Sequence, residues 1–155
     1  MSNNNRLHQT EDFALGYNCI TDLEKKHPEM LMDFGILKLN KDMVFQDDRP
    51  NLERVYLLIY GKVEVTYDGE TVSAERRSYL NENIWCINVP KGGSLSVKGL
   101  AEDSEIAVMR TENDKIFPPV VRCGDEIVNE IRGKGFMNKA ETKIVRTAQD
   151  VHTAA

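Results

Sequence analysis

The sequence predicts an all-β fold, built as a single β-barrel or sandwich, and three observations support this class. The apolar runs are short, rich in β-branched and aromatic residues, and bounded by Gly, Pro, Asn or Asp. Residues 62–67 alternate strictly between polar and apolar, so Val63, Val65 and Tyr67 share one face of a half-buried strand. Asp68-Gly69 then supplies the positive φ angles of a two-residue hairpin turn.

The other elements follow from the same signals, taken in chain order. Strands are expected at 30–39, 55–60, 63–67, 70–73, 84–89, 95–97 and 106–109. Long helical crossovers between strands are missing from this pattern, which favours a jelly roll over an α/β fold. At most two short helices are expected. One is 22–27, ended by Pro28, and the other is 123–132, whose apolar spacing also suits a strand.

The length of 155 residues is that of one domain. Residues 1–12 are polar and aperiodic, which predicts a flexible lead-in. The domain is expected to cover 13–150, and 151–155 form a tail. No apolar stretch reaches the length of a membrane span, and the first residues lack the apolar core of a secretory signal. A cytoplasmic protein without a membrane partner is therefore expected.

Acidic residues outnumber basic ones by 25 to 20, for a net charge of -5. Nucleic-acid binding needs clustered excess Lys and Arg, so nucleic acid is not an expected partner. The three cysteines, Cys19, Cys86 and Cys123, fit neither a disulfide framework nor Cys-x-x-Cys metal spacing. They are expected to be reduced thiols, and Cys86, in an apolar run, is assigned no chemistry.

Two segments have the spacing of the metal-binding motifs of cupin barrels but lack the ligands. Those motifs are His-x-His followed by Glu and Gly, then Pro-x-Gly-x-x-His. Aligned on Gly61 and on 90–92, the sequence places Arg54 at the Glu position and Leu95 at the last His position. The earlier His positions fall within 47–50, which has no histidine. The sequence therefore resembles a cupin jelly roll without metal.

No zinc, iron or manganese site is expected in this chain, and no catalytic residue or metal ligand is predicted. The three histidines, His8, His27 and His152, lie far apart in polar contexts and are expected at the surface. The carboxylates of Asp47-Asp48 and of 102–105 are in turn-like contexts and are interpreted as loops without acid-base chemistry.

The interior-facing residues of the barrel are the candidate ligand-lining residues. The period of two places Arg54, Tyr56 and Leu58 on one face, and Leu95 and Val97 are expected opposite them. The Arg54 guanidinium is suited to hold the carboxylate of a uronic or other sugar acid. Two alternatives remain open. Arg54 pairs with Glu53 or Glu64 of the same chain, or it lies at an interface with a partner barrel.

A basic segment near the end of the chain is a second candidate for contacting an anion. Its cations include Arg132, Lys134 and Arg146, and its two glycines let backbone approach a ligand closely. The alternative is a solvated linker face, because Gly-x-Gly without a following periodic helix is a weak phosphate signal.

Several separated runs can be compared with a known family, and they are 30–39, 54–58 with Gly61, 104–108, 132–135, 137–138 and 146–147. In this order they resemble the amino-terminal half of the 5-deoxy-glucuronate isomerases of inositol breakdown, which are related to the 4-deoxy-5-ketouronate isomerases. The similarity covers about residues 16–150. In that family two cupin domains are fused, and the second carries the metal-binding histidines.

The resemblance implies an aldose-ketose isomerase that uses a divalent metal to polarise a carbonyl. For this chain it implies the metal-free amino-terminal cupin, acting as a scaffold or substrate cover without isomerase activity alone. Whether the chain counts as an enzyme stays open at this point. The alternatives are a metal-free sugar-acid sensor or carrier, and an interaction module that pairs with a separately encoded catalytic cupin. A homodimer or a partner cupin domain is expected.

Overall fold

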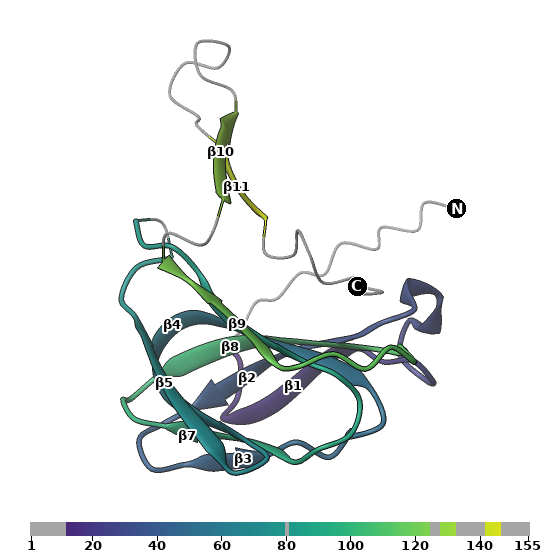
Figure 1. Cartoon of the computed structure of the whole chain (residues 1–155). Helices are drawn as coiled ribbons and strands as arrows, with labels where there is room; N and C mark the ends of the chain where they lie inside the picture. The colour runs from purple at the N-terminus through teal and green to yellow at the C-terminus, as the bar shows by residue number, and fades with distance from the viewer. Residues whose placement is uncertain (1–11, 80, 125–127, 133–141, 147–155) are drawn as a thin grey trace, which may run out of the picture.

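A computed structural model describes residues 12–79, 81–124, 128–132 and 142–146 (Figure 1). Its elements are β1 (Gly16–Thr21), the 3-10 helix η1 (Pro28–Met30), β2 (Asp33–Leu39), β3 (Val44–Gln46), β4 (Glu53–Tyr67), β5 (Glu70–Arg76), β6 (Trp85–Val89), β7 (Leu95–Gly99), β8 (Ser104–Thr111), β9 (Val120–Cys123), β10 (Val128–Arg132) and β11 (Thr142–Arg146). The predicted all-β cupin jelly roll is confirmed.

The strands β1 to β9 are arranged in two facing layers (Figure 1). One layer has the order β1-β2-β8-β4-β6-β9, and the other joins β5, β4, β7 and β3. All of these pairings are antiparallel. Strand β4 belongs to both layers. Its first half pairs with β6 and β8, and its second half pairs with β5 and β7.

The bend that lets β4 serve both layers lies at residues 58–61. The register against β8 shifts between Leu58 and Tyr60, and Gly61 has a φ of 105°. A Cβ on Gly61 would lie 2.6 Å from the Cα of Ser104, so only glycine fits this close approach. The Ser104 hydroxyl completes the corner, because it accepts from the Lys62 N–H and donates to the Lys62 carbonyl, each at 3.1 Å.

The hairpin predicted at Asp68-Gly69 is confirmed. Both residues have positive φ, 46° and 87°, and β4 and β5 pair in register from Tyr67↔Glu70 to Gly61↔Arg76. The alternation expected in this strand is also present, since Val63 and Val65 are buried while Lys62 is exposed.

The core lies between the two layers. Its buried members are Leu37, Leu39, Tyr56, Leu58, Val63, Val65, Ala74, Trp85, Ile87, Val89, Leu95, Val97, Ile106 and Val108. They come from both layers in period-two alternation. Burial of these apolar surfaces is therefore the main term that closes the sandwich.

Some element predictions were wrong in detail. Residues 22–27 form bends rather than a helix, and the 3-10 helix η1 begins at Pro28 instead of ending there, because proline's fixed φ suits a first helical position. Strand β2 begins at Asp33, not at Met30. Strand β8 begins at Ser104, so part of the acidic run 102–105 is strand rather than loop.

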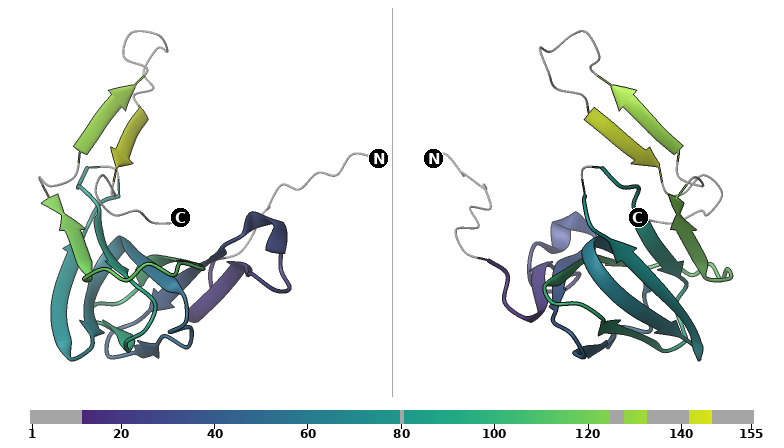
Figure 2. Two further views of the ribbon diagram at one scale, coloured as in Figure 1. Left: turned by 45° about the vertical axis from the view of Figure 1, so that its right-hand side comes forward. Right: turned by 90° about the vertical axis from the view of Figure 1, so that its left-hand side faces the viewer.

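Apart from Gly124, the described residues of the candidate helix over 123–132 are in strands. Cys123 ends β9, and Val128–Arg132 form β10, which pairs with β11 in a separate two-stranded sheet (Figure 2). The apolar spacing of this segment is compatible with a helix or a strand. The antiparallel pairing of β10 with β11 favours the strand. The lead-in at 1–11 and the tail at 151–155 lie outside the described residues, so the domain limits stay predictions. Within the described ranges, no helix is long and apolar enough to cross a membrane.

Candidate functional site

A row of charged side chains crosses the inner face of the larger layer. The pairing register places Asp33 of β2 opposite Arg110 of β8, and Arg110 opposite Arg54 of β4. All three residues are buried, and Arg54 is 0% exposed. Two like charges directly opposite on neighbouring strands repel each other, so this row needs a further anion.

Asp47 supplies that anion from the loop that follows β3. Its Oδ2 accepts a hydrogen bond from the Tyr56 hydroxyl and another from Arg110 Nε at 3.1 Å, and it lies 3.0 Å from Arg110 Nη2. Its Oδ1 lies 3.6 Å from Arg54 Nη1. The backbone N–H of Arg49 donates to the same Oδ1 at 2.8 Å, which fixes the loop. We call Asp47, Arg54, Tyr56 and Arg110 the inner ion cluster.

Arg54 also ties the cluster to the turn after β6. Its Nη2 donates to the carbonyl oxygens of Pro90, at 3.2 Å, and of Gly92. The turn 90–93 is the segment predicted from the Pro-x-Gly spacing. Arg54 therefore uses its guanidinium to hold the protein's own carboxylate and carbonyl groups.

The far side of Arg110 is covered by an aromatic ring. The Arg110 guanidinium carbon lies 4.6 Å from the centre of the Tyr17 ring, a cation–π contact. Gly35 makes room for this ring, since a Cβ there would lie 2.6 Å from ring atoms of Tyr17 and from the Asn18 carbonyl oxygen. Burial raises the pKa of Tyr17 to about 12, against the opposing effect of the Arg110 charge.

The electrostatics of the cluster keep Asp47 ionised. Burial alone would raise the pKa of Asp47, but the Tyr56 hydrogen bond and the Arg110 charge outweigh it, and the pKa is lowered. Burial lowers the pKa of Arg110, while the neighbouring Tyr56 and Asp47 raise it above its usual value overall. Burial, with the Asp47 charge, raises the pKa of Tyr56. At neutral pH the cluster thus contains a carboxylate, two guanidinium groups and a neutral phenol.

The donor set of the cluster does not fit a divalent metal. Leu95, at the position of the last histidine, has no ligand atom in its side chain, and Arg54 presents cationic donors. Both Asp47 oxygens already have partners in the cluster. Over the described ranges, no group of three or more His, Cys, Asp or Glu side chains is placed to hold a metal ion. The absence of a metal cofactor in this chain stays a prediction.

The structure places Arg54, Tyr56, Leu58, Leu95 and Val97 together in the interior, each 0% exposed. The last three belong to the apolar core, Arg54 belongs to the inner ion cluster, and Tyr56 belongs to both, because its ring packs in the core and its hydroxyl binds Asp47. Of the open alternatives for Arg54, pairing within the chain is observed, but with Asp47. Glu53, one of the two carboxylates considered beside Glu64 as its partner, is buried as well, and its Oε2 accepts from Asn113 Nδ2 at 2.6 Å. A role of these five residues in lining a ligand stays a prediction.

The basic candidates are not brought together in the same way. In the β10–β11 ladder Arg132 is opposite Thr142, while Arg146 is opposite Val128, so the two lie at opposite ends of the hairpin. Lys134 lies outside the described residues. Contact of this segment with an anion stays a prediction.

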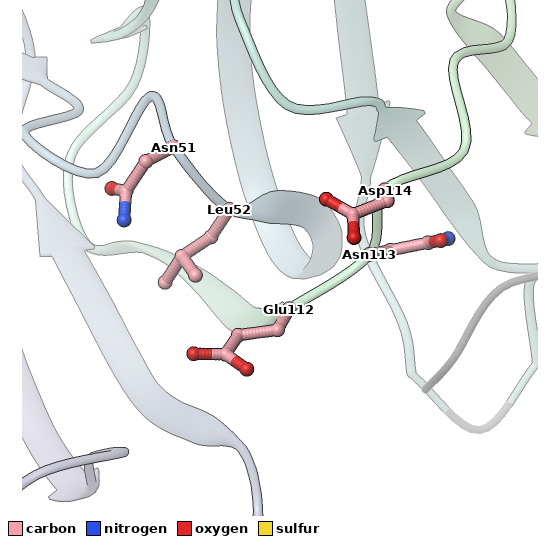
Figure 3. Close-up of a pocket in the computed structure, with 5 residues that line it drawn as sticks. All are labelled: Asn51, Leu52, Glu112, Asn113 and Asp114. Atoms are coloured by element: carbon pink, nitrogen blue, oxygen red, sulfur yellow. The ribbon is translucent and has the colours of Figure 1, made fainter.

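A pocket of about 420 Å³ lies beside the start of β4 and the end of β8 (Figure 3). It is lined by Asn51 and Leu52, which precede β4, and by Glu112, Asn113 and Asp114, which follow β8. Lys91 Nζ contacts the Asp114 carboxylate. The lining carries two carboxylates, so this pocket disfavours an anionic ligand such as a uronate.

Sequence reasoning missed Asp47, Arg110 and Asp33 as members of the site. Arg110 continues the buried alternation Ser104, Ile106, Val108, and Asp33 begins the buried face of β2, so the period of two contained both signals. Asp47 was interpreted as a loop without a role. It is indeed in a loop, but its side chain is buried, and only the partners contributed by β4 and β8 show why.

Comparisons with known proteins agree with this fold. A family model described as the KduI/IolB family matches residues 7–154. An IolB-like protein from Salmonella typhimurium LT2 superposes with a TM-score of 0.66 at 18% identity, over 79% of this chain and 47% of that one. The chain thus spans about half the length of that protein.

Two further solved structures are similar at lower levels. A putative glyoxylate-induced protein from Pseudomonas aeruginosa gives a TM-score of 0.50 at 15% identity, over 65% of this chain and 38% of that one. The cupin domain of Schizosaccharomyces pombe Cnp3 gives 0.48 at 14%, over 63% and 60%. Among curated proteins, none matches this sequence.

Proposed function

The chain belongs to the KduI/IolB family, and we propose that it acts there as a metal-free cupin of the kind that forms the amino-terminal half of a 5-deoxy-glucuronate isomerase. Its role is to provide scaffold or to cover the substrate. Isomerisation of the deoxy-uronic acid belongs to a second, metal-bearing cupin, which is either fused to it or separately encoded. When bound in that second cupin, the divalent ion polarises the substrate carbonyl.

The observation that carries this proposal is the inner ion cluster. At the positions where a catalytic cupin presents histidine and carboxylate ligands, this barrel presents Arg54, Leu95 and a carboxylate that is already bonded. The surrounding interior is filled by core side chains such as Leu58 and Val97. Such a site offers no position for a reacting carbonyl next to a Lewis acid.

The match to about half of the IolB-like protein also supports a role beside another domain. Among the described residues, β1 and β9 are the edge strands of one layer and β3 and β5 those of the other, and edge strands are common sites of pairing with another chain. A homodimer or a partner cupin is the expected assembly.

An activity assay of the purified chain tests the proposal. The chain is incubated with a deoxy-uronic acid and with manganese or zinc, alone and mixed with a cupin that carries the Pro-Pro-His-x-His motif. We expect no turnover by the chain alone, and an increase in the activity or stability of the partner cupin in the mixture. Turnover by the chain alone that a chelator abolishes would refute a non-catalytic role.

Calorimetry separates this function from that of a sugar-acid carrier. Arg54 is fully buried, and its Nη atoms already have partners in Asp47 and the turn 90–93. A uronic acid is therefore expected to release little heat with the wild-type chain. Tight binding that is lost in Arg54→Ala would favour the carrier instead.

A further inference from the structure

We propose that Arg54, Tyr56 and Arg110 form a carboxylate-binding site, and that the side chain of Asp47 is its resident ligand. The three binding residues stand on β4 and β8, in the rigid larger layer. The ligand comes from the loop between β3 and β4. A free carboxylate of the size of formate is expected to bind there once the Asp47 carboxylate is removed.

The geometry is that of carboxylate recognition rather than of a chance ion pair. One oxygen of Asp47 receives the Tyr56 hydroxyl and Arg110 Nε, the latter at 3.1 Å, and the other faces Arg54 Nη1 at 3.6 Å. The carboxylate is thus held between two guanidinium groups, with a neutral donor beside them. Arg110 presents two guanidinium nitrogens, Nε and Nη2, to the same oxygen at 3.1 and 3.0 Å, and charged donors of this kind are strong partners of a carboxylate.

Because Arg54 and Arg110 are buried, the site needs an anion to balance their charges. Arg54 and Arg110 are 0% and 2% exposed and are directly opposite each other in the pairing register. Within the described residues, a second carboxylate near them is that of Asp33, whose Oδ2 is 4.0 Å from Arg110 Nη1. Without Asp47 two guanidinium groups would share a buried site with one distant carboxylate, a costly arrangement. A small anion that enters would relieve that cost.

The ligand class follows from the space that Asp47 occupies. In Asp47→Ala the Cβ remains, so the vacated volume is that of one carboxylate group, which matches formate. Chloride has the charge but not the two oxygens that the Tyr56 hydroxyl and the guanidinium groups contact. The site is therefore expected to prefer formate to chloride at equal ionic strength.

The experiment is chemical rescue of Asp47→Ala, followed by thermal unfolding. The variant is unfolded in sodium formate and in sodium chloride at equal ionic strength. We expect its midpoint to rise by about 4 °C when formate is at about ten times its Kd. The wild-type midpoint is expected to be the same in both salts. If Asp47→Ala folds only in formate, that result also supports the site.

Two matched variants control the result. Val97→Ala removes a fully buried apolar side chain from the same core and offers no cation, so formate should not raise its midpoint above that in chloride. Asp47→Ala combined with Arg54→Met removes one guanidinium, and the formate effect should vanish. Equal midpoints of Asp47→Ala in the two salts, failure to fold in both, or an equal formate effect in Val97→Ala would each overturn the proposal.

Discussion

Asp47 is the residue on which the polar interior depends. It is buried, and it contacts both guanidinium groups and the Tyr56 hydroxyl. Breaking a buried ion pair by removing one partner typically costs about 3–5 kcal/mol, because the remaining charge stays buried without compensation. In a variant without the Asp47 carboxylate, the buried charges of Arg54 and Arg110 would cause this loss of stability.

The pH dependence of stability follows from the lowered pKa of Asp47. Its ordinary value is 3.8, and its folded value is lower, so the ionised group stabilises the folded state above 3.8. That contribution is lost as the pH falls through the lowered folded pKa. The charged or titratable groups that face it are Arg54 and Tyr56 on β4 and Arg110 on β8, and Asp33 on β2 lies 4.0 Å from Arg110. We predict that acid destabilises the wild type more than Asp47→Asn.

Urea unfolding checks this prediction. The free energy of unfolding of both proteins is measured at about pH 7 and at a series of values below the ordinary pKa of an aspartate. The difference between the two proteins should shrink towards the acid end. If the two curves run parallel over the whole range, Asp47 does not titrate as the cluster geometry requires.

At the scale of elements, β4 determines how the two layers are joined. The hydrophobic pattern indicated two strands, 55–60 and 63–67, with Gly61 between them. The structure instead has one strand of 15 residues, with a register shift between Leu58 and Tyr60, just before the glycine. A bulge and a turn both interrupt the alternation of polar and apolar residues, so the pattern alone does not distinguish them. The close approach of Gly61 to Ser104 does, and these two residues are 43 positions apart by their numbering.

The short edge strands β3 and β9 could not be predicted from the alternation of polar and apolar residues either. Strands β3 and β9 have three and four residues, too few for alternation to be recognised, and they exist because β7 and β6 offer edges to pair with. The long hairpin was predictable because its signals are local. An Asp-Gly turn and strict alternation need no information from the rest of the chain.

The hairpin turn yields a prediction at this scale. Gly69 has a φ of 87° and no atom within 4 Å of a Cβ placed on it, so backbone conformation alone limits the residue there. Gly69→Val should destabilise the protein by about 1–2 kcal/mol, the cost of a left-handed conformation for such a residue. Gly69→Asn should cost less, since asparagine tolerates that conformation. Chemical denaturation that finds the two variants equally stable would contradict the assigned turn.

At the scale of the whole molecule, the sequence indicated both the jelly roll and the changed ligand positions. Motif spacing was sufficient to place Arg54 and Leu95 in the interior, because a strand and a tight turn keep their spacing when the ligands are lost. Spacing could not show what replaces the ligands. That answer depends on Asp47 and Arg110, which are 63 positions apart and meet only in the closed barrel.

The chain is a barrel of the KduI/IolB family, and the charges in its interior are balanced by the protein's own side chains. The charged row crosses three strands, and the loop after β3 supplies the anion that balances it. We propose that the polar interior joins the strands and the loop after β3, and that isomerisation belongs to a second cupin.

Metal retention is the measurement that tests this account most directly. The untagged chain and Asp47→Asn are incubated with manganese or zinc, dialysed, and analysed for metal content by mass spectrometry. We expect both proteins to retain only substoichiometric metal. Retention of one ion per wild-type chain, lost in Asp47→Asn, would show that the interior coordinates a metal and would contradict the account.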